Sequence, residues 1–175
     1  MIRKFREILY FLVFVLLQTL VVNNIHLFGI VTPFIYVYVI MKFRLNISRS
    51  SLIILSFLLG LSIDIFSNTI GLHAATCTFI GFIRNPILEQ FVDMKELPDG
   101  SVPSVRLFGF SKFIRYILIM VTLHHAIMFS VESFSFHQPL FLFTRMILSI
   151  LLSCLLIFIL EAFNLRNKRK WRTTD

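Results

Sequence analysis

Long apolar runs alternate with short polar or charged clusters along the whole chain. A helix needs about 20 residues to cross the roughly 30 Å of a bilayer's hydrocarbon core, and most of these runs approach that length. We therefore predict an all-α integral membrane protein that forms a single domain over residues 1–175. The remaining segments are a loop at 87–111 and a basic tail at 164–175. The six expected transmembrane helices are residues 7–23, 28–42, 51–67, 71–85, 112–131 and 140–163.

The first two runs each allow two interpretations. A basic head precedes the first run, as in a cleavable signal peptide, but no small-residue cleavage site follows it. We therefore interpret this run as a retained helix. In the second run, Thr32 followed by Pro33 is typical of a helix start, with the threonine as cap and the proline in the first turn. The alternative is a longer helix that begins near Leu27 and is kinked at the proline.

The fourth predicted helix combines small residues with a proline near its end. Small side chains allow close helix packing in lipid, so we expect this helix to be central and surrounded by protein. Pro86 disfavours helical geometry in the residue before it, which predicts a helix end at Arg84–Asn85. The small or hydroxylated residues are Gly71, Ala74, Ala75, Thr76, Thr78 and Gly81.

Composition supports a lipid environment. Hydrophobic residues make up 57% of the chain and charged residues 15%, whereas soluble domains contain about 45–50% and about 25%. The net charge of +8 could suggest nucleic acid, but the Lys and Arg residues cluster between or beyond the apolar runs. This is the positive-inside distribution, so we interpret the charge as a signal of topology and expect no nucleic-acid partner.

The same charges give the expected orientation. Six crossings place both termini on one side of the membrane. If that side is the cytoplasm, every Lys and Arg except Arg145 lies inside, as the positive-inside rule requires. The loop at 87–111 is then cytoplasmic, and the basic tail can contact anionic lipid or a cytoplasmic protein.

Asp64 is the acid in the last turn of the third predicted helix, and residues 67–71 supply turn-forming side chains after it. An ionisable group at this depth is costly and commonly functional. One interpretation is a solvated carboxylate that marks the helix end. The other is a carboxylate that faces a pocket or partner near the outer surface and pairs with His73 or Arg145. Glu132, at the outer end of the fifth predicted helix, competes for Arg145.

Other polar residues in the apolar runs have simpler interpretations. His124 and His125 could form a proton relay or a metal site, but adjacent helical residues point about 100° apart, which disfavours a shared ligand. Arg84, Glu89 and Glu161 lie at expected inner helix ends, so we interpret them as charges that reach the interface from apolar stems. None of these residues predicts catalysis.

Two cysteines and two glycines complete the candidates. Cys77 and Cys154 lack metal-site spacing and are interpreted as buried small residues. No phosphate-binding loop, serine-hydrolase or zinc-protease motif occurs, so we expect no enzyme activity, catalytic residue, metal or cofactor. Because the turn and the fourth helix both rely on a missing side chain, we expect Gly71→Leu to be more damaging than Gly60→Ala.

The stretch Gly60-Leu61-Ser62-Ile63-Asp64-Ile65-Phe66, followed by Gly71-Leu72-His73-Ala74, resembles MreD, the rod-shape-determining membrane protein of bacteria. That family shows a G-x-x-x-D-x-F turn, a small polar gap and a G-x-x-A helix start. Thr32-Pro33 before an apolar run with Tyr36 and Tyr38 is similar to the family's second segment. The loop at 87–111 is longer and more polar than the family pattern. The candidate partner or pocket residues are Asp64, Phe66, Gly71, His73, Glu132 and Arg145.

The resemblance implies a non-enzymatic scaffold of the cell-elongation complex in the bacterial cytoplasmic membrane. Its implied partners are an MreC-like bitopic protein, the cytoskeletal protein MreB, a RodA-type glycosyltransferase and a penicillin-binding transpeptidase. The family is also similar in fold to the substrate-binding subunits of energy-coupling-factor vitamin transporters. A second hypothesis is therefore a transporter subunit with an outward-facing binding cavity. A scaffold requires an exposed groove for a partner helix, whereas a transporter subunit requires an enclosed polar cavity.

Overall fold

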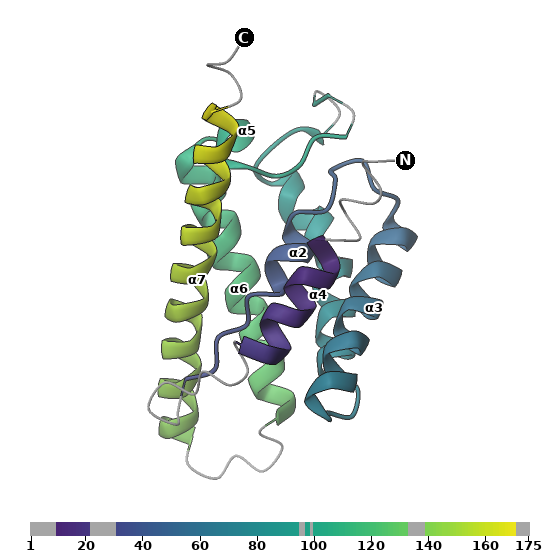
Figure 1. The fold of residues 1–175 in the computed structure, drawn as a ribbon, viewed down its shortest axis with the longest axis vertical. Coiled ribbons are helices and arrows are strands. Elements are labelled where there is room, and N and C mark those ends of the chain that lie inside the picture. Colours follow the sequence, from purple (N-terminus) through teal and green to yellow (C-terminus); the bar gives the residue numbers. More distant parts are fainter. Residues whose placement is uncertain (1–9, 22–30, 95–96, 99, 133–138, 171–175) are drawn as a thin grey trace.

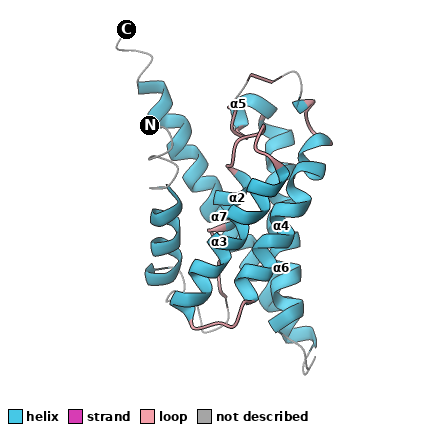
Figure 2. Ribbon diagram, turned by 90° about the vertical axis from the view of Figure 1, so that its right-hand side faces the viewer, coloured by secondary structure: helices cyan, strands magenta, loops and turns pink. Residues whose placement is uncertain are grey.

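The computed structural model describes residues 10–21, 31–94, 97–98, 100–132 and 139–170, and every regular element in these ranges is helical. An apolar helix at Tyr10–Leu20 comes first, and its last turn is the π-helical η1 (Leu17–Val21). Loops alone interrupt the helices in Figure 2. The all-α class is therefore confirmed for the described residues. The other elements are α2 (Val37–Met41), α3 (Arg49–Ser67), α4 (Leu72–Glu89), α5 (Val105–Phe108), α6 (Phe110–Glu132) and α7 (Pro139–Lys170).

The long helices run side by side in alternating directions (Figure 1). The start of α3, the end of α4, the short α5 and the end of α7 lie at one end of the bundle, which we call the α5 end. The connection between α3 and α4 lies at the opposite end, which we call the turn end. The segments predicted to be cytoplasmic thus gather at the α5 end.

α4 packs against α3, α6 and α2, which confirms its predicted central position. It is not surrounded by protein, because Ala75, Phe79 and Phe82 on one face are exposed. Its contact with α3 is made by backbone as well as side chains. A Cβ added to Gly60 would lie 2.6 Å from the Cα of Ala74, and one added to Gly81 would collide with the hydroxyl of Ser56. Two missing side chains therefore set the spacing of α3 and α4.

Residues 31–36, which we call the extended segment, form no helix, and all of them except half-buried Thr32 are buried, so the predicted helix over 28–42 is wrong at these positions. The segment ends at Tyr36, which has helical dihedral angles and caps α2. Within the described part of 28–42, only α2, with five residues, is helical. The amides of residues 32, 34 and 35 are bonded by side chains of other helices, as the next subsection describes. A non-helical backbone inside a membrane protein needs such partners for its polar groups. Sequence pattern alone favoured a helix because it carried no sign of these distant partners.

α4 does not end at Arg84–Asn85, because it continues through Pro86 to Glu89. Proline in a helix interior removes one backbone hydrogen bond and normally kinks or ends the helix. Here the ring of Pro86 is exposed, while Ile87 and Leu88 beyond it are buried. The packing of these two apolar side chains offsets the missing hydrogen bond.

Among the described residues, three helices are long and apolar enough to cross a membrane: Arg49–Ser67, Phe110–Val131 and Leu140–Asn164. The helix at Tyr10–Leu20 is apolar but shorter, and the six-span arrangement stays a prediction. The last span continues as α7 to Lys170, so the first part of the basic tail is helical. Residues 171–175 lie outside the described residues.

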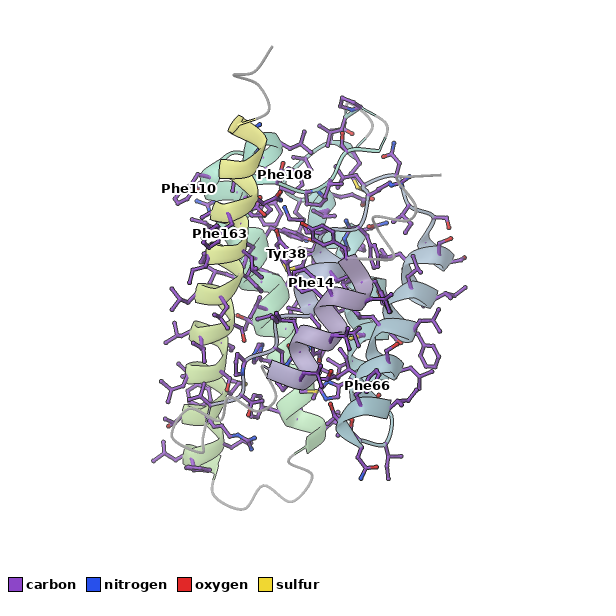
Figure 3. The ribbon with its side chains drawn as sticks, in the orientation of Figure 1. Phe14, Tyr38, Phe66, Phe108, Phe110 and Phe163 are labelled. Atoms are coloured by element: carbon purple, nitrogen blue, oxygen red, sulfur yellow. The ribbon has the colours of Figure 1, made fainter. Side chains whose placement is uncertain are left out.

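Phenylalanine serves both the core and the outer surface, as Figure 3 shows. The ring centroids of Phe14 and Tyr38 lie 5.7 Å apart between the first helix and α2. Phe66 and Phe163 are instead mostly exposed, near opposite ends of the bundle. An exposed aromatic surface of this kind suits contact with lipid or with another membrane protein.

Candidate functional site

Asp64 is buried and caps α4, so it does not mark a solvated helix end. Its Oδ1 accepts hydrogen bonds from the Thr69 hydroxyl and from the backbone N–H of His73, the latter at 3.0 Å. Its Oδ2 accepts from the backbone N–H of Ala74 at 2.8 Å. A carboxylate at this position satisfies unpaired amides of the first helical turn and complements the positive end of the helix. The predicted closeness of Asp64 and His73 is confirmed, but the contact uses the histidine backbone.

Gly71 has the turn conformation expected of it, but the close helix contact that was also expected there is made by Gly60. Gly71 precedes α4 with φ of +72°, which favours glycine, but a Cβ there would meet no atom within 4 Å. Gly60 has no room for a Cβ, because the backbone of His73 and Ala74 lies against it. The structure therefore reverses the expected order, and Gly60 becomes the more sensitive position.

A buried chain of hydrogen bonds joins α4, the extended segment and α6. The hydroxyl of Tyr36 lies 2.8 Å from Nδ1 of His73 and 2.8 Å from Nε2 of His124. Nδ1 of His124 has no hydrogen-bond partner within the described residues. Because buried unpaired N–H groups are rarer than unpaired acceptors, we assign the His124 proton to Nε2. His124 then donates to Tyr36, and Tyr36 donates to His73.

His125 belongs to a second network that holds the extended segment against α7. Its Nε2 lies 3.0 Å from the hydroxyl of Ser153, which also accepts the backbone N–H of Phe34 at 3.0 Å. Ser149 accepts the N–H of Thr32 at 3.1 Å. The two adjacent histidines thus face different partners, and the described residues contain no group of three His, Cys, Asp or Glu that could hold a metal ion.

Gln18 completes this framework from the first helix. Its side chain donates to the carbonyl of Pro33 at 3.1 Å and accepts the N–H of Ile35 at 2.9 Å. The ring of Phe34 packs edge-on against His73 and His124, with centroids 5.7 and 5.6 Å apart. Tyr36, Ser153 and Gln18 in this core therefore each bond to another protein group, although Nδ1 of His124 is left without a partner among the described residues.

Buried charges form a separate cluster at the α5 end. The ammonium of Lys42 lies 2.7 Å from Glu161 Oε2 and donates to the carbonyl of Pro103 at 2.6 Å. The Tyr38 hydroxyl donates to the same glutamate oxygen at 2.6 Å. This cluster ties α2, α7 and the connection before α5 together. The sequence pattern did not predict this charge cluster, although Lys42 and Glu161 are complementary charges at the ends of two apolar runs.

Arg84 is fully buried at the same end, where it binds backbone carbonyls. Its guanidinium donates to the carbonyls of Phe43 and Met41 and to the side chain of Asn85. The interpretation of Arg84 and Glu161 as charges that reach the membrane interface is therefore wrong, because both are buried. Glu89, in contrast, is exposed.

The remaining predicted residues do not join Asp64 in one site. Phe66 lies at the turn end with 61% of its surface exposed. The guanidinium of Arg145 lies over the ring of Phe129, 5.2 Å from its centroid, and not against Asp64. Glu132 ends α6, and its side chain lies outside the described residues. Asp64, Gly71 and His73 alone come together.

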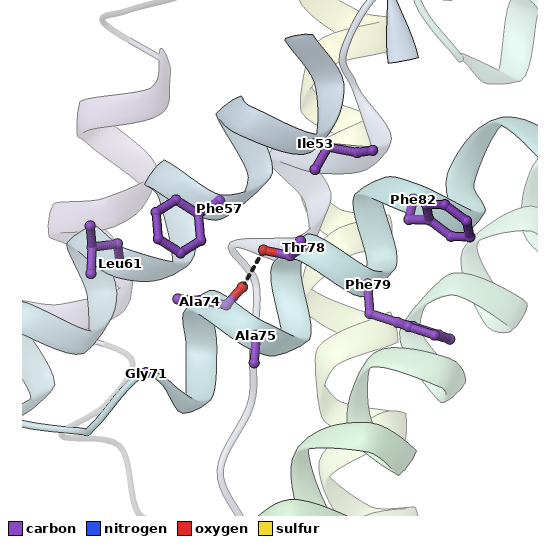
Figure 4. Close-up of a pocket in the computed structure, with 9 residues that line it drawn as sticks. All are labelled: Ile53, Phe57, Leu61, Gly71, Ala74, Ala75, Thr78, Phe79 and Phe82. Atoms are coloured by element: carbon purple, nitrogen blue, oxygen red, sulfur yellow. Dashed lines mark hydrogen bonds between the residues drawn. The ribbon is translucent and has the colours of Figure 1, made fainter. Parts of the chain in front are cut away.

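An open apolar hollow lies beside this turn on the outer side of α3 and α4 (Figure 4). Its volume is about 640 Å³. Thr78 is its one hydroxylated residue, and that hydroxyl donates to the carbonyl of Ala74 at 2.6 Å, so it presents its methyl group. We call this hollow the α3–α4 groove. Its residues are Ile53, Phe57, Leu61, Gly71, Ala74, Ala75, Thr78, Phe79 and Phe82.

The α3–α4 groove has the open shape and the apolar surface expected of a binding site for a transmembrane helix. Small residues of α4 form the bottom of the groove, and phenylalanines from α3 and α4 form its sides. Small residues four apart, such as Gly71 and Ala75, let another helix approach closely in lipid. Comparison of the chain with known protein families, curated proteins and solved structures finds no match.

Proposed function

We propose that this protein is a non-enzymatic scaffold of the bacterial cell-elongation machinery, an MreD-like protein with six spans in the cytoplasmic membrane. In this proposal it holds the transmembrane helix of an MreC-like bitopic protein. MreB, a RodA-type glycosyltransferase and a penicillin-binding transpeptidase are the wider partners. The resemblance at residues 60–74 suggests the family, and the α3–α4 groove is the observation that carries the function.

The groove supports a helix-binding role through its chemistry. In lipid, apolar surface alone gives little drive for association, so close van der Waals packing has to hold two helices together. Ala75 and Thr78 give a partner access to the backbone of α4, while Phe57 and Phe79 offer broad ring surfaces beside it. This combination of small and aromatic residues fits a helix better than a small polar ligand.

The transporter hypothesis has less support. A substrate-binding subunit needs a cavity lined by polar groups that remain available to a ligand. In the described core, Tyr36, His73 and His124 bond to one another, and Gln18 and Ser153 bond to the backbone of residues 33–35. The hollow that does exist is open and apolar.

Site-specific photo-crosslinking in the native cell tests the proposal. A photoreactive phenylalanine analogue in place of Phe79, which lines the groove, should crosslink to the transmembrane segment of an MreC-like protein. The matched control is Phe163, an exposed phenylalanine on α7 away from the groove, where the same analogue should give no such product.

A second measurement uses blocking substitutions. Ala75→Phe should fill the groove and reduce co-purification of the MreC-like protein, together with the rod shape of the cell. Ala162→Phe, at an exposed alanine on α7 away from the groove, should leave both unchanged. Co-purification of paired ATPases with a coupling membrane subunit, in place of the cell-elongation proteins, would contradict the scaffold and favour the transporter.

A further inference from the structure

The α3–α4 groove ends in a cation. Arg49, the first residue of α3, places its guanidinium over the ring of Phe82, 4.4 Å from the centroid. Phe82 belongs to α4 and lines the groove. The arginine therefore reaches across the boundary between the two helices at the α5 end, instead of pointing along the axis of its own helix.

The stacking of Arg49 on Phe82 leaves the guanidinium able to bind an anion. A guanidinium that lies on an aromatic ring keeps its N–H groups at the edge, where they can bind a carboxylate with two parallel hydrogen bonds. Arg49 forms no salt bridge within the described part of the chain, including with exposed Glu89 two turns beyond Phe82. Arginine and aromatic residues together are also typical of sites that dominate binding energy.

The opposite end of the groove carries no comparable charge. Gly71 lies there, and the nearby acid, Asp64, is buried and bonded to the start of α4. Between Gly71 and Phe82 the helix rises about 16 Å, or three turns. An occupant thus meets an apolar path of three turns with a single cation at the α5 end.

From this polarity we infer that the groove binds a transmembrane helix with an acidic residue at the end that meets Arg49. This inference rests on the proposed function and specifies the chemistry of the partner helix. The acid lies about three turns from a small residue that packs near Gly71 and Ala75. The carboxylate fixes the direction in which the helix enters the groove, because the reversed helix would place its acid beside the uncharged turn end.

A membrane helix is favoured over an anionic lipid by the lower part of the groove. An acyl chain is flexible and gains little from backbone access, whereas Gly71, Ala74 and Ala75 present the α4 backbone to a rigid neighbour. Arg49 also lies over the wall of the groove, within reach of a helix that fills it.

The test uses two synthetic transmembrane helices in vesicles of neutral phosphatidylcholine. Each probe is about 22 residues long, sufficient to cross the bilayer, with alanine at every fourth position of one face. One carries glutamate near one end, and its twin carries glutamine. Binding to the full-length protein is measured by energy transfer between dyes on probe and protein.

We expect the glutamate probe to bind about tenfold more tightly than its twin, which corresponds to about 1.4 kcal/mol. Arg49→Gln should remove this preference while both probes still bind. Arg115→Gln, which changes an exposed arginine on α6, is the matched control and should keep it. Ala75→Phe should weaken the binding of both probes.

Three other outcomes overturn the inference in distinguishable ways. Equal binding of both probes, unaffected by Arg49→Gln but lost in Ala75→Phe, would remove the role of the acid and leave the helix-binding groove in place. Binding of neither probe would count against the groove as a helix site and hence against the proposed function. If phosphatidylglycerol displaces the glutamate probe in wild type but not in Arg49→Gln, the arginine binds a lipid phosphate and the inference is wrong.

Discussion

Gly60 of α3 lies against the backbone of His73 on α4, with no space for a methyl group between them. The contact falls in the same turn of structure where Asp64 caps α4. The capping carboxylate and the close helix contact therefore support each other: one fixes the start of α4, and the other fixes its distance from α3. The turn between α3 and α4 is thus a structural joint beside the groove.

The first prediction concerns the two glycines. Gly60→Ala should lower the free energy of unfolding by about 3 kcal/mol, because α3 and α4 must separate to admit the Cβ. Gly71→Ala should cost about 1 kcal/mol, since it meets open space and only its positive φ is unfavourable. Thermal unfolding of both variants in the same detergent measures the difference. Equal losses would contradict the close contact at Gly60.

The second prediction concerns Asp64. Asp64→Ala should destabilise the protein by about 2 kcal/mol, because the amides of His73 and Ala74 and the hydroxyl of Thr69 lose their acceptor. Asp64→Asn should cost less, since the amide oxygen still accepts one of these bonds. Stability is measured by unfolding, and crosslinking through the analogue at Phe79 is measured on the folded fraction. A loss of crosslinking with unchanged stability would instead indicate that Asp64 contacts a partner.

The third prediction concerns the Lys42–Glu161 pair. Lys42→Met should cost about 3 kcal/mol, because it leaves a buried carboxylate without its cation. Glu161→Gln added to it should recover part of that loss, since the neutral amide needs no counter-charge and can still accept from Tyr38. The double-mutant cycle is followed by chemical unfolding in detergent. Additive losses would show that the two charges are not coupled in the folded protein.

The fourth prediction tests orientation. Val102→Cys, near α5, should react with a membrane-impermeant thiol reagent only from the cytoplasm. Ile70→Cys, fully exposed at the turn end, should react only from outside. The native Cys77 and Cys154 are buried and should give little background. Labelling of both new cysteines from the same side would overturn the proposed topology.

Local features were predictable from sequence where their causes are local. The apolar run before Asp64 and the serines near its start predicted α3 to within two residues at its beginning and correctly at its end. Ser48 caps this helix through the N–H of Ser51. The central position of α4 followed from its small residues, because their packing role depends on side-chain size alone.

Distant pairings were not predictable in the same way. The non-helical backbone at residues 31–35 depends on Ser149 and Ser153, more than a hundred positions further along the chain. Arg84 and Glu161 had the sequence pattern of interfacial charges. Only the fold shows that both are buried, where backbone carbonyls bind Arg84 and Lys42 pairs with Glu161. Arg49 was not predicted as a site residue, because an arginine at a helix start is common in sequences. Only the structure shows that its guanidinium lies over the ring of Phe82.

The hydrogen bonds of the extended segment also set the order in which the protein can be completed. Residues 31–36 leave the ribosome long before Ser149 and Ser153 of α7, which lie more than a hundred positions later in the chain. Until α7 is inserted, the amides of Thr32 and Phe34 lack their partners, and this part of the nascent chain cannot settle in a lipid environment without loss of hydrogen bonds. This segment therefore settles only after α7 has been inserted, and a truncation before α7 should leave a product that the cell's membrane quality control removes.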